Sequence, residues 1–256
     1  IGSVSNGGVQ LQITLVDGVT TAQANTLLQA ITYSNANNNP PAGVTIDYFI
    51  DDGNTNTGTT PQGSSAPLHL TGSGSIAVTI VRMNDTPTLT GLAARSYTED
   101  GAAIGIGGGA LAADPELSAL AGASGDWGGA TLTLSRHGGA SAEDQFSAGG
   151  TLAPLTEGGS LIDGVTPLGT VTRNSNGTLV LTFASGVSTS QIQSAITQIA
   201  YANSRQSLGA SGLASVTLDW VLDDQNPNTT GGGSAGAGQD QGGGGRLAAT
   251  TAQKIS

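Results

Sequence analysis

Apolar and polar positions follow the same pattern in two separate stretches of the chain. Residues 11–35 and 179–203 each hold an apolar strand, a glycine turn, a helix-like segment and the sequence Ile-x-Tyr-x-Asn. Residues 44–58 and 216–231 form a second matched pair, which begins with alternating apolar and polar side chains and ends in a polar run. Self-similarity of this kind is typical of tandem repeats, so the pattern predicts two copies of one structural unit.

Each copy predicts one short helix followed by one strand. The apolar residues with the i, i+3, i+4, i+7 spacing of a helix face are Ala24, Leu27, Leu28 and Ile31 in the first copy and Ile192, Ala195, Ile196 and Ile199 in the second. Both helices begin with a capping-box sequence, at residues 20–23 and 188–191. The strands at residues 44–51 and 216–223 alternate, which predicts one face toward a core and one toward water.

The duplication predicts a partial repeat at residues 1–86 and a complete repeat at residues 87–256. Ile1 aligns near Gly169, halfway through the second copy, so the first copy corresponds to half of a β-sandwich with an open core and open strand edges. Either the front half was removed or lies outside this sequence, or another chain completes it. Additional strands are predicted at residues 75–81, 95–98, 102–106, 130–135, 169–173 and 246–252, with residues 144–146 in a loop-rich stretch.

Composition favours an all-β fold and excludes several classes of function. The chain has 41 glycines and 37% hydrophobic residues in many short alternating runs, a mixture typical of β-sandwiches with long loops. Its net charge of −11, with 7 Lys and Arg in total, leaves no basic patch for nucleic acid or an anionic membrane surface. No apolar run of membrane length and no signal peptide is present. Cysteine is absent, so divalent cations are the natural stabilising partner of this acidic chain.

The polar run after each alternating strand is a candidate Ca²⁺ loop. It places carboxylate and amide oxygens, the ligands that Ca²⁺ prefers, at alternate positions. Its residues are Asp51, Asp52, Asn54 and Asn56 in the first copy and Asp223, Asp224, Asn226 and Asn228 in the second. Gly63 stands where an EF-hand needs glutamate, so the loop is not an EF-hand. A plain turn rich in Asp and Asn is the alternative interpretation.

The order of motifs resembles a known family over essentially the whole chain. The motifs are an Asn-Asp-x-Pro junction at 84–87, Tyr-x-Glu-Asp-Gly at 97–101, Ala-Asp-Pro-Glu at 113–116, Gly-x-Leu-x-Leu at 177–181, Ile-x-Tyr-x-Asn at 199–203 and Val-Thr-Leu-Asp-Trp-Val-Leu-Asp-Asp at 216–224. The chain is thereby similar to the cadherin-like tandem repeats of large bacterial surface proteins and repeat adhesins. The resemblance implies extracellular Ig-like β-sandwiches joined end to end, with Ca²⁺ at the junctions.

The resemblance also favours a second Ca²⁺ site at the junction between the repeats. Its candidate ligands are Asn84, Asp85, Glu99, Asp100, Asp114 and Glu116. Convergence of these carboxylates without a cation would be opposed by like-charge repulsion. Scattered surface acids are the alternative.

Signals for an enzyme or for a glycan site are weak. The Gly-x-Ser-x-Gly sequence at 232–236 lies in a glycine run without the strand and helix of a nucleophile elbow. The glycine-rich residues 105–110 loosely match a dinucleotide fingerprint, but Asp114-Pro115 interrupts any following helix. Trp220 is expected in the core, whereas Trp127 is either a stacking surface for glycans or a plug at the end of the sandwich.

The sequence therefore predicts a non-enzymatic structural or adhesive repeat of a secreted cell-surface protein, stiffened by Ca²⁺ and packed against neighbouring repeats. A self-assembling sheath, filament or surface-layer subunit, completed by another copy, is one alternative. A carbohydrate-binding module is the other.

Overall fold

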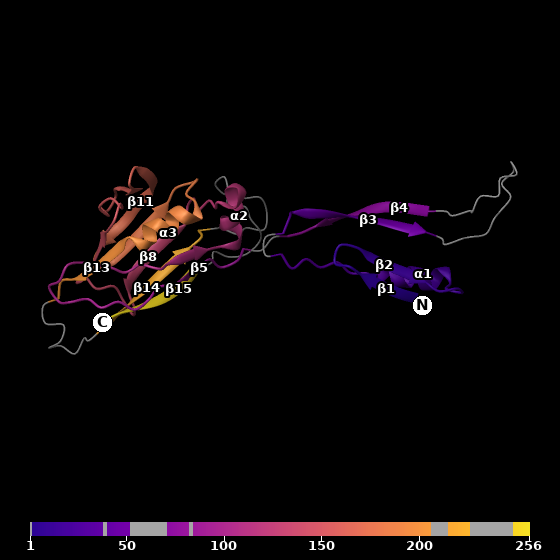
Figure 1. Ribbon diagram of the computed structural model, residues 1–256, viewed down its shortest axis with the longest axis horizontal. Coiled ribbons are helices and arrows are strands. Elements are labelled where there is room, and N and C mark those ends of the chain that lie inside the picture. Colours follow the sequence, from indigo (N-terminus) through magenta and orange to yellow (C-terminus); the bar gives the residue numbers. More distant parts are fainter. Residues whose placement is uncertain (1, 38–39, 52–70, 82–83, 206–214, 226–247) are drawn as a thin grey trace. The chain divides into compact units, whose positions relative to one another are not determined.

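Figure 1 shows the computed structural model, which describes residues 2–37, 40–51, 71–81, 84–205, 215–225 and 248–256. The chain divides into two compact units, residues 1–37 and 38–256, and each is described by itself. The described part consists mainly of antiparallel strands with three short helices, which confirms the all-β prediction at this level. None of the helices in this part is both long and apolar enough to cross a membrane. The predicted repeat boundary between residues 86 and 87 stays a prediction that rests on the duplication.

The first unit is a two-stranded ribbon followed by a helix. Strands β1 (Gly2–Asn6) and β2 (Leu11–Leu15) pair in antiparallel register, from Gly2 opposite Leu15 to Asn6 opposite Leu11. Helix α1 (Thr21–Gln29) begins with the predicted capping box, in which the Thr20 hydroxyl accepts from the Gln23 backbone and Gln23 accepts from the Thr20 backbone. None of the α1 residues is buried, so the apolar face of this helix packs against no core.

The second unit begins with a long hairpin. Strands β3 (Gly43–Asp51) and β4 (Thr71–Thr79) pair along their whole length, from Gly43 opposite Thr79 to Asp51 opposite Thr71. Strand β4 starts four residues before the predicted start at Ser75, because the hairpin pairs along the entire length of β3.

The rest of the second unit contains the other strands and helices (Figure 1). These are β5 (Thr88–Thr90), β6 (Ile104–Gly105), β7 (Leu111–Ala113), α2 (Pro115–Ala123), β8 (Thr131–Arg136), β9 (Asp144–Ala148), β10 (Ser160–Asp163), β11 (Thr166–Ser175), β12 (Thr178–Phe183), α3 (Thr189–Thr197), β13 (Ile199–Asn203), β14 (Val216–Asp223) and β15 (Ala248–Ile255).

Strand β8 lies in the middle of the largest sheet. The order of this six-stranded sheet is β10-β11-β12-β8-β14-β15. Leu132 of β8 lies opposite Leu181 of β12 on one side and opposite Leu222 of β14 on the other. A three-stranded sheet has the order β6-β13-β9, and β5 pairs with β7. β12 and β14 belong to the duplicated sequence of the second copy. They are joined in the sheet by β8, which precedes that duplicated sequence in the chain.

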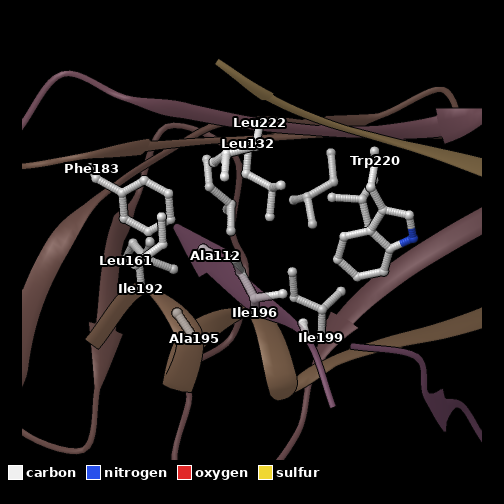
Figure 2. Close-up of a cluster of buried hydrophobic side chains, with 14 of the residues drawn as sticks. Ala112, Leu132, Leu161, Phe183, Ile192, Ala195, Ile196, Ile199, Trp220 and Leu222 are labelled. Atoms are coloured by element: carbon white, nitrogen blue, oxygen red, sulfur yellow. The ribbon is translucent and has the colours of Figure 1, made fainter. Parts of the chain in front are cut away.

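The core lies where α3 and β13 face the six-stranded sheet. In Figure 2, Ile192, Ile196 and Ile199 point toward Leu132, Trp220 and other apolar side chains of the sheet. Helix α3 begins with the predicted capping box between Ser188 and Gln191. The inward positions of Ile192, Ile196 and Trp220 are confirmed in this copy, because these side chains are fully buried. Ile199, predicted on the same helix face, is also buried but is the first residue of β13.

The two copies share local geometry as well as sequence. Gly2 and Gly169 both face the C-terminal residue of the next strand, Leu15 and Phe183. A Cβ added at Gly2 would lie 1.9 Å from the Thr14 carbonyl oxygen, and one added at Gly169 would lie 2.0 Å from that of Thr182. Gly169 therefore aligns with Gly2, one residue later than the sequence predicted. A bulge in β11 gives the second copy one extra residue.

Several predicted strands differ from those observed. Residues 144–146, predicted in a loop-rich stretch, belong to β9, which pairs with β13 from Ala148 opposite Ile199 to Asp144 opposite Asn203. The strand predicted at 95–98 is reduced to a single bridge between Arg95 and Ile255. The last strand, β15, ends at Ile255, three residues beyond the predicted end at Ala252, because it pairs with β14 as far as Val216.

Candidate functional site

Buried polar side chains gather in the second unit where β14 ends and α2 begins. They are Asn84, Asp114, Glu116, Asp223 and Asp224. Asn84 comes from the segment before β5, the next two from the start of α2, and the last two from the end of β14. Only 10% of this chain is charged, and a buried charge is costly unless it is paired. This end of the repeat is therefore the strongest candidate for a functional site.

Asp114 is held by the helix that it caps. Its Oδ1 accepts hydrogen bonds from the backbone nitrogens of Glu116 and Leu117, at 2.9 and 2.7 Å, and Pro115 follows it as the first helical residue. The sequence Asp-Pro-Glu thus encodes a helix start. The other oxygen, Oδ2, is buried and accepts no hydrogen bond from an N–H or hydroxyl group of the described residues, while the Glu116 carboxyl lies within hydrogen-bonding reach of Asp114. Capping therefore accounts for only one of the two carboxylate oxygens.

In Glu116, too, only one of the two carboxylate oxygens accepts a hydrogen bond. Its Oε2 accepts a hydrogen bond from the backbone nitrogen of Asp85 at 3.3 Å, whereas Oε1 is buried without a partner in the described part. Burial, reinforced by the charge of Asp114, raises the pKa of Glu116 to about 7. Burial also raises the pKa of Asp114 to about 6, with a further contribution from the charge of Asp224. These carboxyls therefore lie close enough to oppose one another's ionisation.

Asp224 connects the end of β14 to the segment between the repeats. It is fully buried and accepts a hydrogen bond from the side-chain amide of Asn84, a residue 140 positions away. The neighbouring Asp223 accepts from the backbone nitrogen of Gln225 at 2.8 Å, and the Gln225 amide donates to Thr131 at 3.1 Å. Of the predicted Asp-Asp pair, Asp223 thus lies in a local turn and Asp224 contacts the junction segment.

Other predicted ligands belong to different places or to segments outside the described residues. Asp85 is half-buried beside Glu116. Asp51 is the last residue of β3 in the hairpin and is exposed. The predicted ligands that lie outside the described residues are Asp52, Asn54, Asn56, Asn226 and Asn228.

Glu99 and Asp100 do not join the buried group. They follow Tyr97, whose backbone nitrogen donates to the Ser256 carbonyl at 2.8 Å. Ser256 follows Ile255, which pairs with the first residue of β14, whereas Asp224 follows the last. The length of β14 separates the two ends by roughly 25 Å. Figure 1 shows α2 at one end of these strands and the C-terminus at the other. The predicted convergence of all the junction acids is therefore wrong for Glu99 and Asp100.

The donor chemistry at the buried end fits Ca²⁺ better than a transition metal. The available groups are carboxylate oxygens of Asp114, Glu116 and Asp224 and the carboxamide of Asn84, all hard ligands, with no histidine or cysteine in the group. In the described part of the chain, no three Asp, Glu, His or Cys side chains are close enough together to hold a metal ion as they stand. The carboxylates would have to draw together, and water or backbone carbonyls would have to complete the coordination.

A second polar network, around Asp144, was missed by sequence reasoning. Asp144 is buried and accepts hydrogen bonds from the Tyr201 hydroxyl at 2.7 Å and from the Asn203 amide at 2.8 Å, besides an ion pair with Arg136 at 2.8 Å. The Tyr201 pKa is raised by burial and by this hydrogen bond to Asp144. The repeated Tyr-x-Asn sequence was the available signal, because it places two polar groups in an otherwise apolar strand. Both Asp144 carboxylate oxygens have hydrogen-bond partners within the fold, so the network is structural.

The weaker candidates from the sequence gain no support. Trp127 is fully buried and donates from Nε1 to Thr189 at 3.0 Å, so its interpretation as an exposed stacking surface is wrong. The glycine-rich residues 105–110 connect β6 to β7 and lead into no helix. The Gly-x-Ser-x-Gly sequence at 232–236 lies outside the described residues.

Comparisons with family models, with curated proteins and with solved structures found no match to this chain.

Proposed function

We propose that the chain is a structural repeat segment of a large extracellular surface protein, built from cadherin-like β-sandwiches and stabilised by Ca²⁺. In this proposal, residues 87–256 form a complete sandwich and residues 1–86 form the back half of another. The buried carboxylate group beside the Asn-Asp-x-Pro junction carries the proposal. In particular, Asp114 Oδ2 and Glu116 Oε1 are buried and accept no hydrogen bond from an N–H or hydroxyl group in the described part of the chain.

Asp114, Glu116, Asp224 and Asn84 would hold the ion. A bound Ca²⁺ supplies the positive charge that these buried oxygens lack. Asn84 and Asp85 already connect the junction segment to Asp224 and Glu116 by hydrogen bonds. A Ca²⁺ ion bound by the ionised carboxyls would add ligand bonds to these hydrogen bonds and so hold the junction segment more firmly against the end of β14. The functional effect is mechanical, because a fixed junction holds one repeat at a defined angle to the next.

Calcium-dependent unfolding of the 256-residue chain tests this proposal. A ligand that binds only the folded state adds about 2.7 kcal/mol at one hundred times its dissociation constant. We expect Ca²⁺ to raise the melting temperature relative to chelator and Glu116→Gln to remove most of that increase. Glu99→Gln is the matched control, since Glu99 lies at the opposite end of β14, and it should keep the full increase. Equal melting temperatures with Ca²⁺ and with chelator would rule out the cation and leave direct packing of repeats as the account of stiffness.

A self-assembling subunit is the second candidate function. The apolar side chains of the first copy are exposed where their counterparts in the second copy form a core. An exposed apolar surface of this kind favours a partner. The carbohydrate-binding alternative has lost its candidate platform, because Trp127 is buried.

A further inference from the structure

One hydrogen-bonded cluster of the second unit shares no residue with the buried carboxylate group and contains the groups of an acyl-transfer reaction. It consists of Thr151 in the loop after β9, Asp163 at the end of β10, and Gln198, which caps the C-terminus of α3. The counterpart of Gln198 in the first copy is Ala30, at the same capping position. The helix end therefore does not itself require glutamine, and the surroundings of this side chain must explain it.

The side-chain carbonyl of Gln198 accepts hydrogen bonds from two adjacent backbone donors. Its Oε1 lies 2.6 Å from the backbone nitrogen of Thr151 and 3.0 Å from that of Leu152. Two N–H groups directed at one carbonyl oxygen form an oxyanion hole, because they stabilise the negative charge that this oxygen gains when a nucleophile attacks its carbon. The loop that carries these donors is fixed to the same residue, since the Gly149 nitrogen donates to the backbone carbonyl of Gln198 at 2.8 Å.

The Thr151 hydroxyl lies beside this carboxamide and contacts a base. Its Oγ1 is 3.1 Å from Gln198 Oε1 and donates a hydrogen bond to Asp163 Oδ1. Hydrogen bonds from Thr151 and Ser194 lower the pKa of Asp163, so this carboxylate is ionised at neutral pH and can accept a proton. A hydroxyl that is hydrogen-bonded to a base and lies next to a carbonyl group has the arrangement of an activated nucleophile.

Asp163 also contacts the group that would leave. Its Oδ2 accepts a hydrogen bond from the side-chain nitrogen of Gln198, Nε2, at 3.1 Å. One carboxylate thus faces the proton of the nucleophile with one oxygen and the nitrogen of the leaving group with the other. A single group in this position can take the proton from the hydroxyl and deliver it to the departing nitrogen.

We propose that Thr151 and Gln198 form an intramolecular ester cross-link. Asp163 takes the proton from Thr151 Oγ1, and this oxygen attacks Gln198 Cδ while Oε1 takes up negative charge between the two backbone N–H groups. The Oγ1–Cδ bond forms and the Cδ–Nε2 bond breaks. The proton passes from Asp163 to Nε2, which leaves as ammonia, so the reaction balances without an oxidant or other co-reactant and Asp163 is regenerated.

The cross-link joins the loop after β9 to the end of α3. It closes a covalent ring of residues 151–198, which contains β10, β11 and β12 of the six-stranded sheet. Tension applied to the ends of the chain then passes through the ester and does not draw these strands out. A link of this kind also restricts the unfolded state, as a disulfide does, in a chain that has no cysteine.

Mass spectrometry of the whole 256-residue chain tests the proposal. The ester lowers the intact mass by about 17 Da, the mass of the ammonia released. Trypsin cleaves the denatured chain after arginine, so Thr151 and Gln198 fall in different peptides, residues 137–173 and 174–205. The ester keeps these two peptides together as one species, and mild alkali should separate them by hydrolysing the ester.

Variants of the two reacting groups identify the chemistry. Thr151→Val removes the nucleophile at an exposed position and Asp163→Asn removes the base, so both variants should keep the full mass. Thr151→Ser is the matched control, because it retains the hydroxyl and should still lose ammonia. Circular dichroism checks that each variant is folded.

Three results would overturn the proposal. The first is a wild-type chain that keeps its full mass. The second is a gain of about 1 Da at Gln198, which would mean that water and not Thr151 attacks the carboxamide. The third is a loss of ammonia that persists in Thr151→Val or leaves the two tryptic peptides separate. Because the experiment is done in chelator, its outcome does not depend on the proposed Ca²⁺ site.

Discussion

Arg136 forms a bidentate ion pair with Asp144, with Nε 2.8 Å from Oδ2 and Nη2 2.8 Å from Oδ1. This bidentate pair connects β8 of the large sheet to β9 of the small one. Tyr201 and Asn203 donate to the same carboxylate, so the buried charge is fully satisfied. The network ties the six-stranded sheet to the three-stranded sheet.

Removal of Asp144 should destabilise the second repeat strongly. Asp144→Ala leaves the Arg136 guanidinium and the Tyr201 hydroxyl without their acceptor, and breaking a buried ion pair in this way costs about 3 kcal/mol or more. Guanidinium unfolding followed by tryptophan fluorescence measures this loss, because both tryptophans, Trp127 and Trp220, are in the second repeat. Glu143→Gln is the control. Glu143 lies 3.8 Å from Arg136 and 3.7 Å from Arg205 but is more exposed, so its change should be below about 1 kcal/mol. Similar losses in both variants would mean that the bidentate pair is unimportant.

Equivalent helix positions should respond differently to the same truncation. Ile196 of α3 is 0% exposed, whereas its counterpart Leu28 of α1 is 48% exposed. Ile196→Ala should lower the free energy of unfolding by about 2–5 kcal/mol, since it leaves a cavity in the core. Leu28→Ala should change it by no more than about 0.5 kcal/mol. Thermal unfolding followed by circular dichroism compares the two. A large loss in Leu28→Ala would show that α1 already has a packed partner in the protein alone.

A methyl group at Gly169 should not be tolerated. Its φ is +147°, and an added Cβ would meet the Thr182 carbonyl oxygen at 2.0 Å. We expect Gly169→Ala to destabilise the second repeat by about 2 kcal/mol or more, through backbone strain and displacement of β12. Gly105→Ala is the matched change in open space, with no atom within 4 Å of the new Cβ, and should have little effect. The urea midpoints of unfolding of the two variants are compared. Equal midpoints would contradict the close approach of Gly169 to the Thr182 carbonyl.

The buried acids predict an unusual dependence on pH. In the folded state the pKa of Asp114 is about 6 and that of Glu116 about 7, above their ordinary values of 3.8 and 4.5. The folded state therefore holds protons that the unfolded state releases, so the contribution of these groups is fully present below about pH 4 and is lost as the pH rises through 6 and 7.

Glu116→Gln tests this dependence in chelator, because glutamine resembles the protonated acid. The free energy of unfolding of the variant, minus that of wild type, should be larger at pH 8 than at pH 4. If the site binds Ca²⁺, wild type should become more stable than the variant when Ca²⁺ is added at pH 8. A difference between variant and wild type that stays constant from pH 4 to pH 8 would mean that Glu116 titrates normally.

Periodicity and duplication predicted the local structure well. Both capping boxes and both helices are present, because each depends on nearby residues, although Ile31 and Ile199 lie beyond the ends of α1 and α3. The residues near Asp144 were missed because β9 has only five residues, with Phe146 and Ala148 as its alternating apolar positions, and only pairing with β13 makes it a strand. Asp114 and Glu116 were expected at the junction and Asp224 in a separate loop, and the structure brings the three to one end of the second unit. The sequence reveals neither this contact nor that Glu99 lies at the other end of β14, because both depend on the pairing of distant strands.

The position of β8 also constrains the order in which the repeat can form. Residues 131–136 leave the ribosome well before residues 178–183 and 216–223, with which they must pair on either side. The sheet cannot assemble progressively from its first strand, because its middle is made before either neighbour. Such long-range pairing raises contact order and slows folding. Until β14 is made, Leu132 and Leu134 lack one of the two strands that lie beside them in the folded sheet, so this core is completed only by residues late in the chain.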